Sequence, residues 1–176
     1  MNCSEYLVDF LIKKGVSDIF GYAGGYIVPF IDALNQRNEI QVHVCYNEQG
    51  CSFAANGYAR IRGNIGVYFT TSGPGAINAL GGLADAWFDG IPLMGICGNI
   101  PTNEQKGYSG IRQNGFQEMD ILSITRSITK YSVTPTDADK FPEIVSRAYN
   151  MATLGRKGGV IIDFPFNIQK ADISGR

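Results

Sequence analysis

Two patterns of hydrophobic positions alternate along the chain. Short runs rich in β-branched and apolar residues are separated by longer stretches in which apolar residues recur every third or fourth position. This alternation predicts a strand–helix succession, and therefore a parallel sheet with helices on both faces. The expected strands cover 18–22, 41–46, 65–71, 92–98, 127–133 and 159–164, and the expected helices cover 4–14, 28–35, 48–62, 76–88, 119–124 and 137–154.

The predicted fold class is α/β, a single three-layer domain with a central parallel sheet of about six strands. Ser4 is the expected N-cap of the first helix. We expect residues 1–170 to form the domain and 171–176 to be a tail or the start of a linker. Residues 99–115 lack periodicity, and an irregular segment of this length in a compact domain indicates a functional loop.

Composition and charge exclude several classes of function. The chain has 176 residues, 44% of them hydrophobic, which favours one globular domain over disorder. A net charge of −1 without a basic stripe argues against nucleic acid or an anionic membrane as partner. No apolar run approaches the roughly 20 residues of a membrane span, and no secretory signal is evident, so a cytoplasmic location is expected.

The cysteines predict no metal site. The chain has four cysteines and a single histidine, His43, and no Cys-x-x-Cys pair, so tetrahedral zinc is not expected. Cys45 and Cys97 lie in apolar strand-like runs, where a reduced cysteine behaves as a small buried hydrophobe.

Three predicted strand ends carry unusual residues, at 21–25, 46–50 and 70–75. The carboxyl ends of parallel strands lie along one edge of a sheet, and ligands of open α/β sheets bind beyond that edge. The sequence therefore predicts that a site, if present, lies there.

Glu48 is the strongest single candidate at this edge, because it directly follows a strand and opens a helix. A fixed carboxyl in that position can hold a hydrogen bond to a ring nitrogen of a ligand. The alternative is structural: acidic residues are common in the first turn of helices, where they favour the positive end of the dipole.

The turn Thr71-Ser72-Gly73-Pro74-Gly75 lets a backbone approach a ligand closely, and it is equally compatible with an ordinary strand-to-helix turn. A dinucleotide fingerprint would need glycine at position 78, which is asparagine, and an acid where Cys97-Gly98-Asn99 stands. A Walker A motif is absent. The small residues of 76–86 fit either packing inside the domain or a subunit contact.

Several motifs, in this order, resemble the acetolactate (acetohydroxyacid) synthase family. The similarity extends from the first helix to Asp163-Phe164-Pro165, and Ala23 and Asn47 depart from the residues usual in the family. The motifs are Gly21-Tyr22-Ala23-Gly24-Gly25, Asn47-Glu48-Gln49-Gly50, Asn56-Gly57-Tyr58-Ala59-Arg60, Thr71-Ser72-Gly73-Pro74-Gly75-Ala76-Ile77-Asn78, Asp89-Gly90-Ile91-Pro92-Leu93 and Phe116-Gln117-Glu118-Met119-Asp120.

The resemblance implies the N-terminal pyrimidine-binding (PYR) domain of a thiamine-diphosphate-dependent enzyme. It assigns to Glu48 the hydrogen bond to N1′ of the cofactor aminopyrimidine, which promotes the tautomer that activates the thiazolium carbon. It also implies the remaining site residues: Gly24, Gly25, Thr71, Pro74 and Asn78 beside the cofactor, and Phe116 and Gln117 at the substrate entrance.

The family also implies partners that this chain lacks. A diphosphate-binding (PP) domain, on the same or a partner chain, holds Mg²⁺ through a Gly-Asp-Gly motif, which does not occur here. FAD is possible in the full enzyme, the substrate is a small 2-oxo acid, and a homodimer through PYR domains is expected. Three alternatives stay open: one domain of a longer synthase, the natural small subunit of a split 2-oxo acid decarboxylase, or a non-catalytic interaction module of the same fold.

Overall fold

The computed structural model describes residues 1–107 and 110–174, so residues 175–176 of the predicted tail and 108–109 of the predicted loop lie outside the described residues. Its strands form one sheet in the order β2-β1-β3-β4-β6-β5, and every neighbouring pair is parallel. The predicted α/β class is confirmed. The strands are β1 (Asp18–Gly21), β2 (Gln41–Val44), β3 (Gly66–Thr70), β4 (Leu93–Asn99), β5 (Tyr131–Val133) and β6 (Gly159–Pro165).

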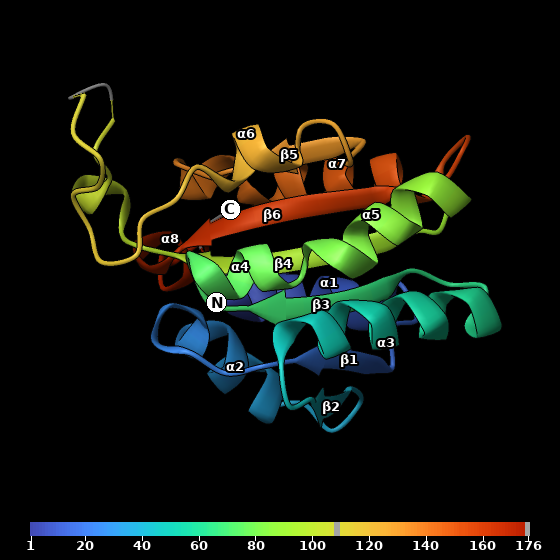
Figure 1. The fold of residues 1–176 in the computed structure, drawn as a ribbon. Helices are drawn as coiled ribbons and strands as arrows, with labels where there is room; N and C mark the ends of the chain where they lie inside the picture. The colour runs from blue at the N-terminus through green and yellow to red at the C-terminus, as the bar shows by residue number, and fades with distance from the viewer. Residues whose placement is uncertain (108–109, 175–176) are drawn as a thin grey trace.

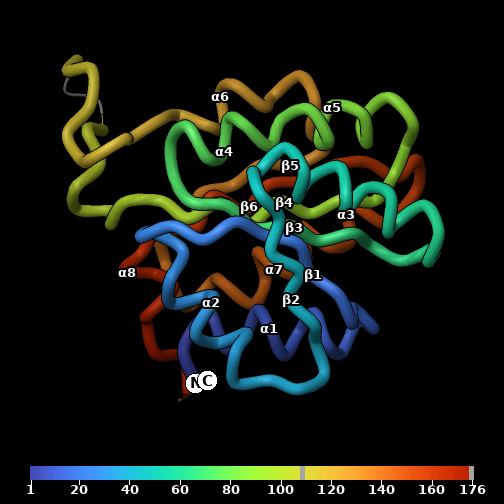
Figure 2. Tube along the Cα trace, turned by 60° about the horizontal axis from the view of Figure 1, so that its bottom comes forward, coloured from blue at the N-terminus to red at the C-terminus, as the bar shows by residue number. Residues whose placement is uncertain are grey.

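Helices cover both faces of the sheet, which gives the three predicted layers (Figure 2). One face carries α3, α4, α5 and α6, and the other carries α1, α2, α7 and α8. The longer helices are α1 (Cys3–Lys13), α2 (Val28–Asn35), α3 (Glu48–Arg62), α5 (Leu80–Asp89) and α7 (Phe141–Thr153). The shorter ones are α4 (Pro74–Asn78), α6 (Ile121–Thr125) and α8 (Phe166–Gln169), with 3₁₀ turns η1 (Gly25–Ile27), η2 (Thr102–Glu104) and η3 (Ala138–Lys140).

Helix α3 packs at backbone distance against both the sheet and α5. A Cβ atom built on Gly66 of β3 would lie 2.1 Å from the Ala55 carbonyl oxygen, and one on Gly82 would lie 2.6 Å from the Ser52 hydroxyl. The Asn56 amide also donates to the Gly82 carbonyl at 3.1 Å. These contacts leave no room for a methyl group, so they fix the position and direction of α3.

The helix predicted for 76–88 is divided in two. Ala79, with φ −80° and ψ −4°, separates α4 from α5. Ala79 is buried, and Gly81 and Gly82 follow it, so the sequence here offers little intrinsic helix propensity to keep the helix continuous. Similarly, the strand predicted for 127–133 is formed only by Tyr131–Val133.

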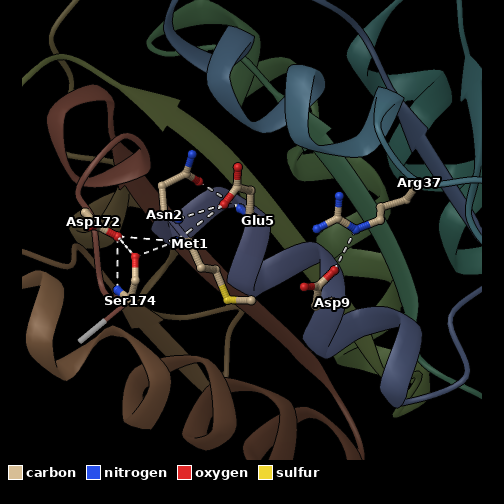
Figure 3. Close-up of polar contacts among 7 residues, drawn as sticks. All are labelled: Met1, Asn2, Glu5, Asp9, Arg37, Asp172 and Ser174. Carbon is tan, nitrogen blue, oxygen red and sulfur yellow. Dashed lines mark hydrogen bonds and ion pairs between the residues drawn. The ribbon is translucent and has the colours of Figure 1, made fainter. Parts of the chain in front are cut away.

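The predicted cap of the first helix is wrong by two residues (Figure 3). The Asn2 side chain accepts from the Glu5 backbone N–H at 2.9 Å, and the Glu5 carboxylate accepts from the Asn2 N–H at 2.9 Å. This reciprocal capping box starts the helix before Ser4, which is buried in the first turn. The same figure shows the two ends of the described chain side by side, with the Met1 ammonium donating to Asp172 and Ser174.

The cysteines differ in burial. Cys97 is completely buried in β4, and burial raises the pKa of its thiol to about 12. Cys45 is only half-buried, which corrects the expectation that it lies in the core. All four cysteines are free thiols.

Asp163 is a buried carboxyl in β6, exposed to only 5%. Its Oδ2 accepts hydrogen bonds from the Asn99 amide and the Thr134 hydroxyl, each at 2.7 Å. Burial raises the pKa of this carboxyl from 3.8 to about 7, although both hydrogen bonds act in the opposite direction. The folded protein therefore retains a proton here that the unfolded chain releases near its ordinary pKa.

Replacing Asp163 by asparagine tests this burial. Because the folded-state pKa is raised, Asp163 makes the protein lose stability as the pH rises from about 4 to about 7, by up to roughly 1.4 kcal/mol per pH unit. In D163N the neutral amide removes this contribution. Urea unfolding at several pH values in that range should show the stability of wild type falling relative to D163N as pH rises; parallel curves would contradict the buried, protonated carboxyl.

Candidate functional site

The candidate site lies at the carboxyl ends of β1, β2 and β3. The sheet order reverses between β1 and β3, because the chain passes from β1 out to β2 and then returns to the other side of β1. Such a reversal is where open α/β sheets bind ligands. The segments 21–25, 46–50 and 70–75 follow these three strands at one edge, as predicted, on the side where the loop between β4 and α6 projects (Figure 1).

Glu48 is positioned by the start of α3. The preceding residue, Asn47, caps the helix by accepting from the Gly50 N–H at 2.7 Å. The half-buried Glu48 carboxylate accepts at Oε2 a hydrogen bond of 2.7 Å from the Asn78 amide. Its Oε1 has no hydrogen-bond partner within the described residues. One oxygen is thus held in place while the other stays available as an acceptor.

Glycines shape the space around this carboxylate. A Cβ on Gly75 would lie 3.2 Å from Glu48 Oε1 and 2.9 Å from the Thr71 methyl group. A Cβ on Gly24 would lie 2.4 Å from Thr71 Cβ, whereas one on Gly25 would meet nothing within 4 Å. The β1 and β3 loops therefore touch across the switch point at Gly24 and Thr71, and the space beside Gly25 is open.

The loop between β4 and α6 reaches the same edge through Gln117. Gly73 has φ 57° and ψ −121°, a conformation that only glycine adopts readily, and a Cβ there would lie 2.5 Å from the Gln117 carbonyl oxygen. Gln117 itself has a φ of 55°, the only positive φ of a non-glycine residue in the described chain. The neighbouring Phe116 is 67% exposed. The Gly73 contact thus holds the Phe116–Gln117 backbone beside the site.

Glu118 anchors this loop, and the sequence alone did not single it out for that role. Its two carboxylate oxygens accept from the backbone N–H groups of Lys106 at 2.7 Å and Asn114 at 2.8 Å. The Asn114 side chain also donates to the Glu104 carbonyl at 3.0 Å. One half-buried carboxylate therefore gathers two distant points of the loop immediately next to Gln117.

The structure brings most of the predicted site residues together. Gly24 and Thr71 are in contact, Glu48 and Asn78 are hydrogen-bonded, and Gln117 reaches them through Gly73. Pro74 opens α4 beside them as an exposed residue. The roles of all these residues toward a ligand stay predictions. In the described part of the chain, no group of His, Cys, Asp and Glu side chains is arranged to hold a metal ion.

Comparison with known proteins adds a decisive observation. Residues 1–124 match the profile of the family described as "Thiamine pyrophosphate enzyme, N-terminal TPP binding domain". The chain belongs to this family. Thiamine pyrophosphate (TPP) and thiamine diphosphate are the same compound, so the family is the one that the motifs indicated.

This chain is similar in sequence to one part of much longer enzymes. It is 41% identical over 167 residues to acetolactate synthase 1, chloroplastic, of Zea mays, covering 95% of this chain and 25% of that protein. It is 40% identical over 171 residues to the large subunit of acetolactate synthase isozyme 2 of Escherichia coli (strain K12), covering 97% and 30%. The chain therefore spans about a quarter to a third of such relatives, and the likeness to acetolactate synthases is confirmed.

No helix within residues 1–107 and 110–174 is long and apolar enough to cross a bilayer.

The Glu118 anchor predicts a local change in loop mobility. In E118Q the side chain keeps its size but has one acceptor oxygen instead of two, so one of the two backbone N–H groups loses its partner. Hydrogen–deuterium exchange should become about five to ten times faster at the amide of Lys106 or Asn114, while amides of the central strands are unchanged.

The exposed Glu104, on the same loop, provides the control, because its carboxylate makes no hydrogen bond to the described residues. E104Q should leave both amide rates as they are. Equal rates in wild type and E118Q would show that the loop is held by other contacts.

Proposed function

We propose that this domain supplies the aminopyrimidine half of a thiamine diphosphate site in a 2-oxo acid decarboxylase or carboligase of the acetolactate synthase type. The observation that carries the proposal is the Glu48 carboxylate, held by Asn78 at the switch point with one oxygen unpaired. Its place in a family of TPP-binding domains, with acetolactate synthases as relatives, supports the reaction class.

The residues at the edge fit an aminopyrimidine ring. Glu48 Oε1 offers an acceptor for a ring nitrogen, and Gly25 leaves open space where any larger residue would project. The Gly75 backbone passes so near the carboxylate that a side chain there would compete with a ligand. These are features of a cradle for a flat, hydrogen-bonding ring.

In this mechanism Glu48 shares a proton with N1′ of the aminopyrimidine. Asn78 orients the carboxyl group through its hydrogen bond to Oε2, so that Oε1 is the oxygen that would meet the ring nitrogen. When bound, the cofactor supplies the carbon nucleophile that attacks a 2-oxo acid. Phe116 and Gln117 line the substrate entrance, on the loop whose backbone Glu118 holds.

The other half of the site belongs to a PP domain on the same or a partner chain. The sequence contains no Gly-Asp-Gly, so we assign the diphosphate and its Mg²⁺ to that domain, and FAD, if the full enzyme uses it, to a further one. A second copy of this domain would pack on the outer side of α3 and α4. Phe53 and Ile77 support that choice, because they are apolar yet 45% and 38% exposed.

Glu48→Gln tests the catalytic assignment when a PP domain is supplied, either fused or as a second chain. The amide cannot exchange a proton with N1′, so hydrogen–deuterium exchange at C2 of bound thiamine diphosphate should slow about 10²- to 10⁴-fold. Proton NMR of the quenched cofactor measures this rate. E39Q, which removes an exposed carboxylate just before β2, is the matched control and should exchange like wild type; unchanged exchange in E48Q would remove Glu48 from the mechanism.

The isolated domain is expected to bind thiamine diphosphate weakly or not at all, because its sequence has no Gly-Asp-Gly motif and residues 1–107 and 110–174 contain no side-chain group arranged to hold a metal ion. Titration calorimetry with Mg²⁺ present measures this directly. Micromolar binding by the domain alone would contradict the division of the site between two domains.

A further inference from the structure

A cavity lies at the opposite edge of the sheet from Glu48. It has a volume of about 300 Å³ and is lined by Trp87, Phe88, Lys130, Arg156 and Lys157. These residues sit at the end of α5 and immediately before β5 and β6, at the amino ends of the strands. Figure 1 shows the end of α5 beside the connection from α7 to β6, far from the loop that projects near the candidate site.

Three positively charged side chains line this cavity, and none of the described residues that line it is acidic. Within the described residues, none of Lys130, Arg156 and Lys157 forms an ion pair with a carboxylate. The nearest acids in sequence on α5, Asp85 and Asp89, are both engaged by Arg60 of α3, at 2.8 and 2.7 Å.

Two of the cations also have structural partners, and these do not neutralise them. The Lys130 ammonium donates to the Leu154 carbonyl at 2.8 Å, and the Arg156 guanidinium donates to the Phe88 carbonyl at 3.1 Å. Both carbonyls belong to helix ends, where cations are favourable. Each cation has further N–H groups, and Lys157 makes no hydrogen bond to any described residue.

The other two residues that line the cavity, Trp87 and Phe88, are aromatic. Phe88 is 69% exposed, and Trp87 is half-buried beside it. The Trp87 indole N–H has no hydrogen-bond partner in the described part of the chain. The cavity therefore combines ring surfaces with donors of positive charge.

We infer that this cavity binds a small molecule in which a flat ring is joined to a phosphate group, as in a nucleoside monophosphate. Trp87 and Phe88 offer faces and edges for the ring, and Arg and Lys together suit a phosphate dianion better than a single negative charge. The volume is at the lower limit of small-molecule sites, which fits a mononucleotide and not a dinucleotide. The inference does not depend on the thiamine diphosphate assignment, which concerns the other edge.

The single tryptophan makes the test direct, because Trp87 is the only one in the chain and lines the cavity. AMP added to the 176-residue protein should change the Trp87 fluorescence saturably. Adenosine, which has the ring without the charge, should bind at least about tenfold more weakly, as should benzoate, which joins a ring to a carboxylate. Inorganic phosphate should compete only at much higher concentration.

Lys157→Glu should weaken AMP binding about tenfold or more, since it replaces the unpartnered cation by an anion. Lys13→Glu makes the same charge change on α1, on the other face of the sheet, and should bind AMP like wild type. Circular dichroism confirms that both variants are folded. Absence of a saturable change with AMP, equal affinity for AMP and adenosine, or equal affinity of K157E and K13E would each overturn the proposal.

Discussion

The closeness of α3 to its neighbours is the constraint on which the arrangement of this domain depends. At Gly66 and Gly82, the backbones of β3 and α5 meet α3 with no side chain between them. A helix that can neither shift nor rotate presents its first residue in one position only, and that residue is Glu48. Asn78 then meets Glu48 because α4 leads directly into α5, which the same contacts hold against α3.

Hydrophobic periodicity was sufficient to predict the class of fold and the edge that carries the candidate site. Parallel strands require their carboxyl ends to lie together, so the unusual residues after β1, β2 and β3 had to meet. Periodicity does not decide between two neighbouring residues that could each cap the same helix. Ser4 and Asn2 are both good caps, and only the reciprocal bond with Glu5 favours Asn2. At Ala79 the sequence shows the glycines that weaken the helix, at positions 81 and 82, but it does not show that Ala79 is buried.

The contacts within the site depend on pairs that no spacing rule reveals. Asn78 lies 30 positions from Glu48, and Lys106 lies 12 positions from Glu118, so neither pair belongs to a helical or strand period. The resemblance to acetolactate synthases pointed to Asn78 as a residue near the cofactor, without its hydrogen bond to Glu48. Burial of Asp163, and the effect of that burial on its charge, also required the packed sheet.

The Glu118 anchor binds main-chain N–H groups, and this has a consequence for the variability of the loop. Every amino acid except proline presents such an N–H, so the side chains at positions 106 and 114 can be exchanged without removing the anchor. Apart from the Asn114 amide, which also donates to the Glu104 carbonyl, the side chains that the loop presents can therefore vary while Glu118 still holds its backbone. Substitutions elsewhere on this loop, with Glu118 and Gly73 kept, would change the chemistry of its surface without releasing its backbone from the edge of the sheet.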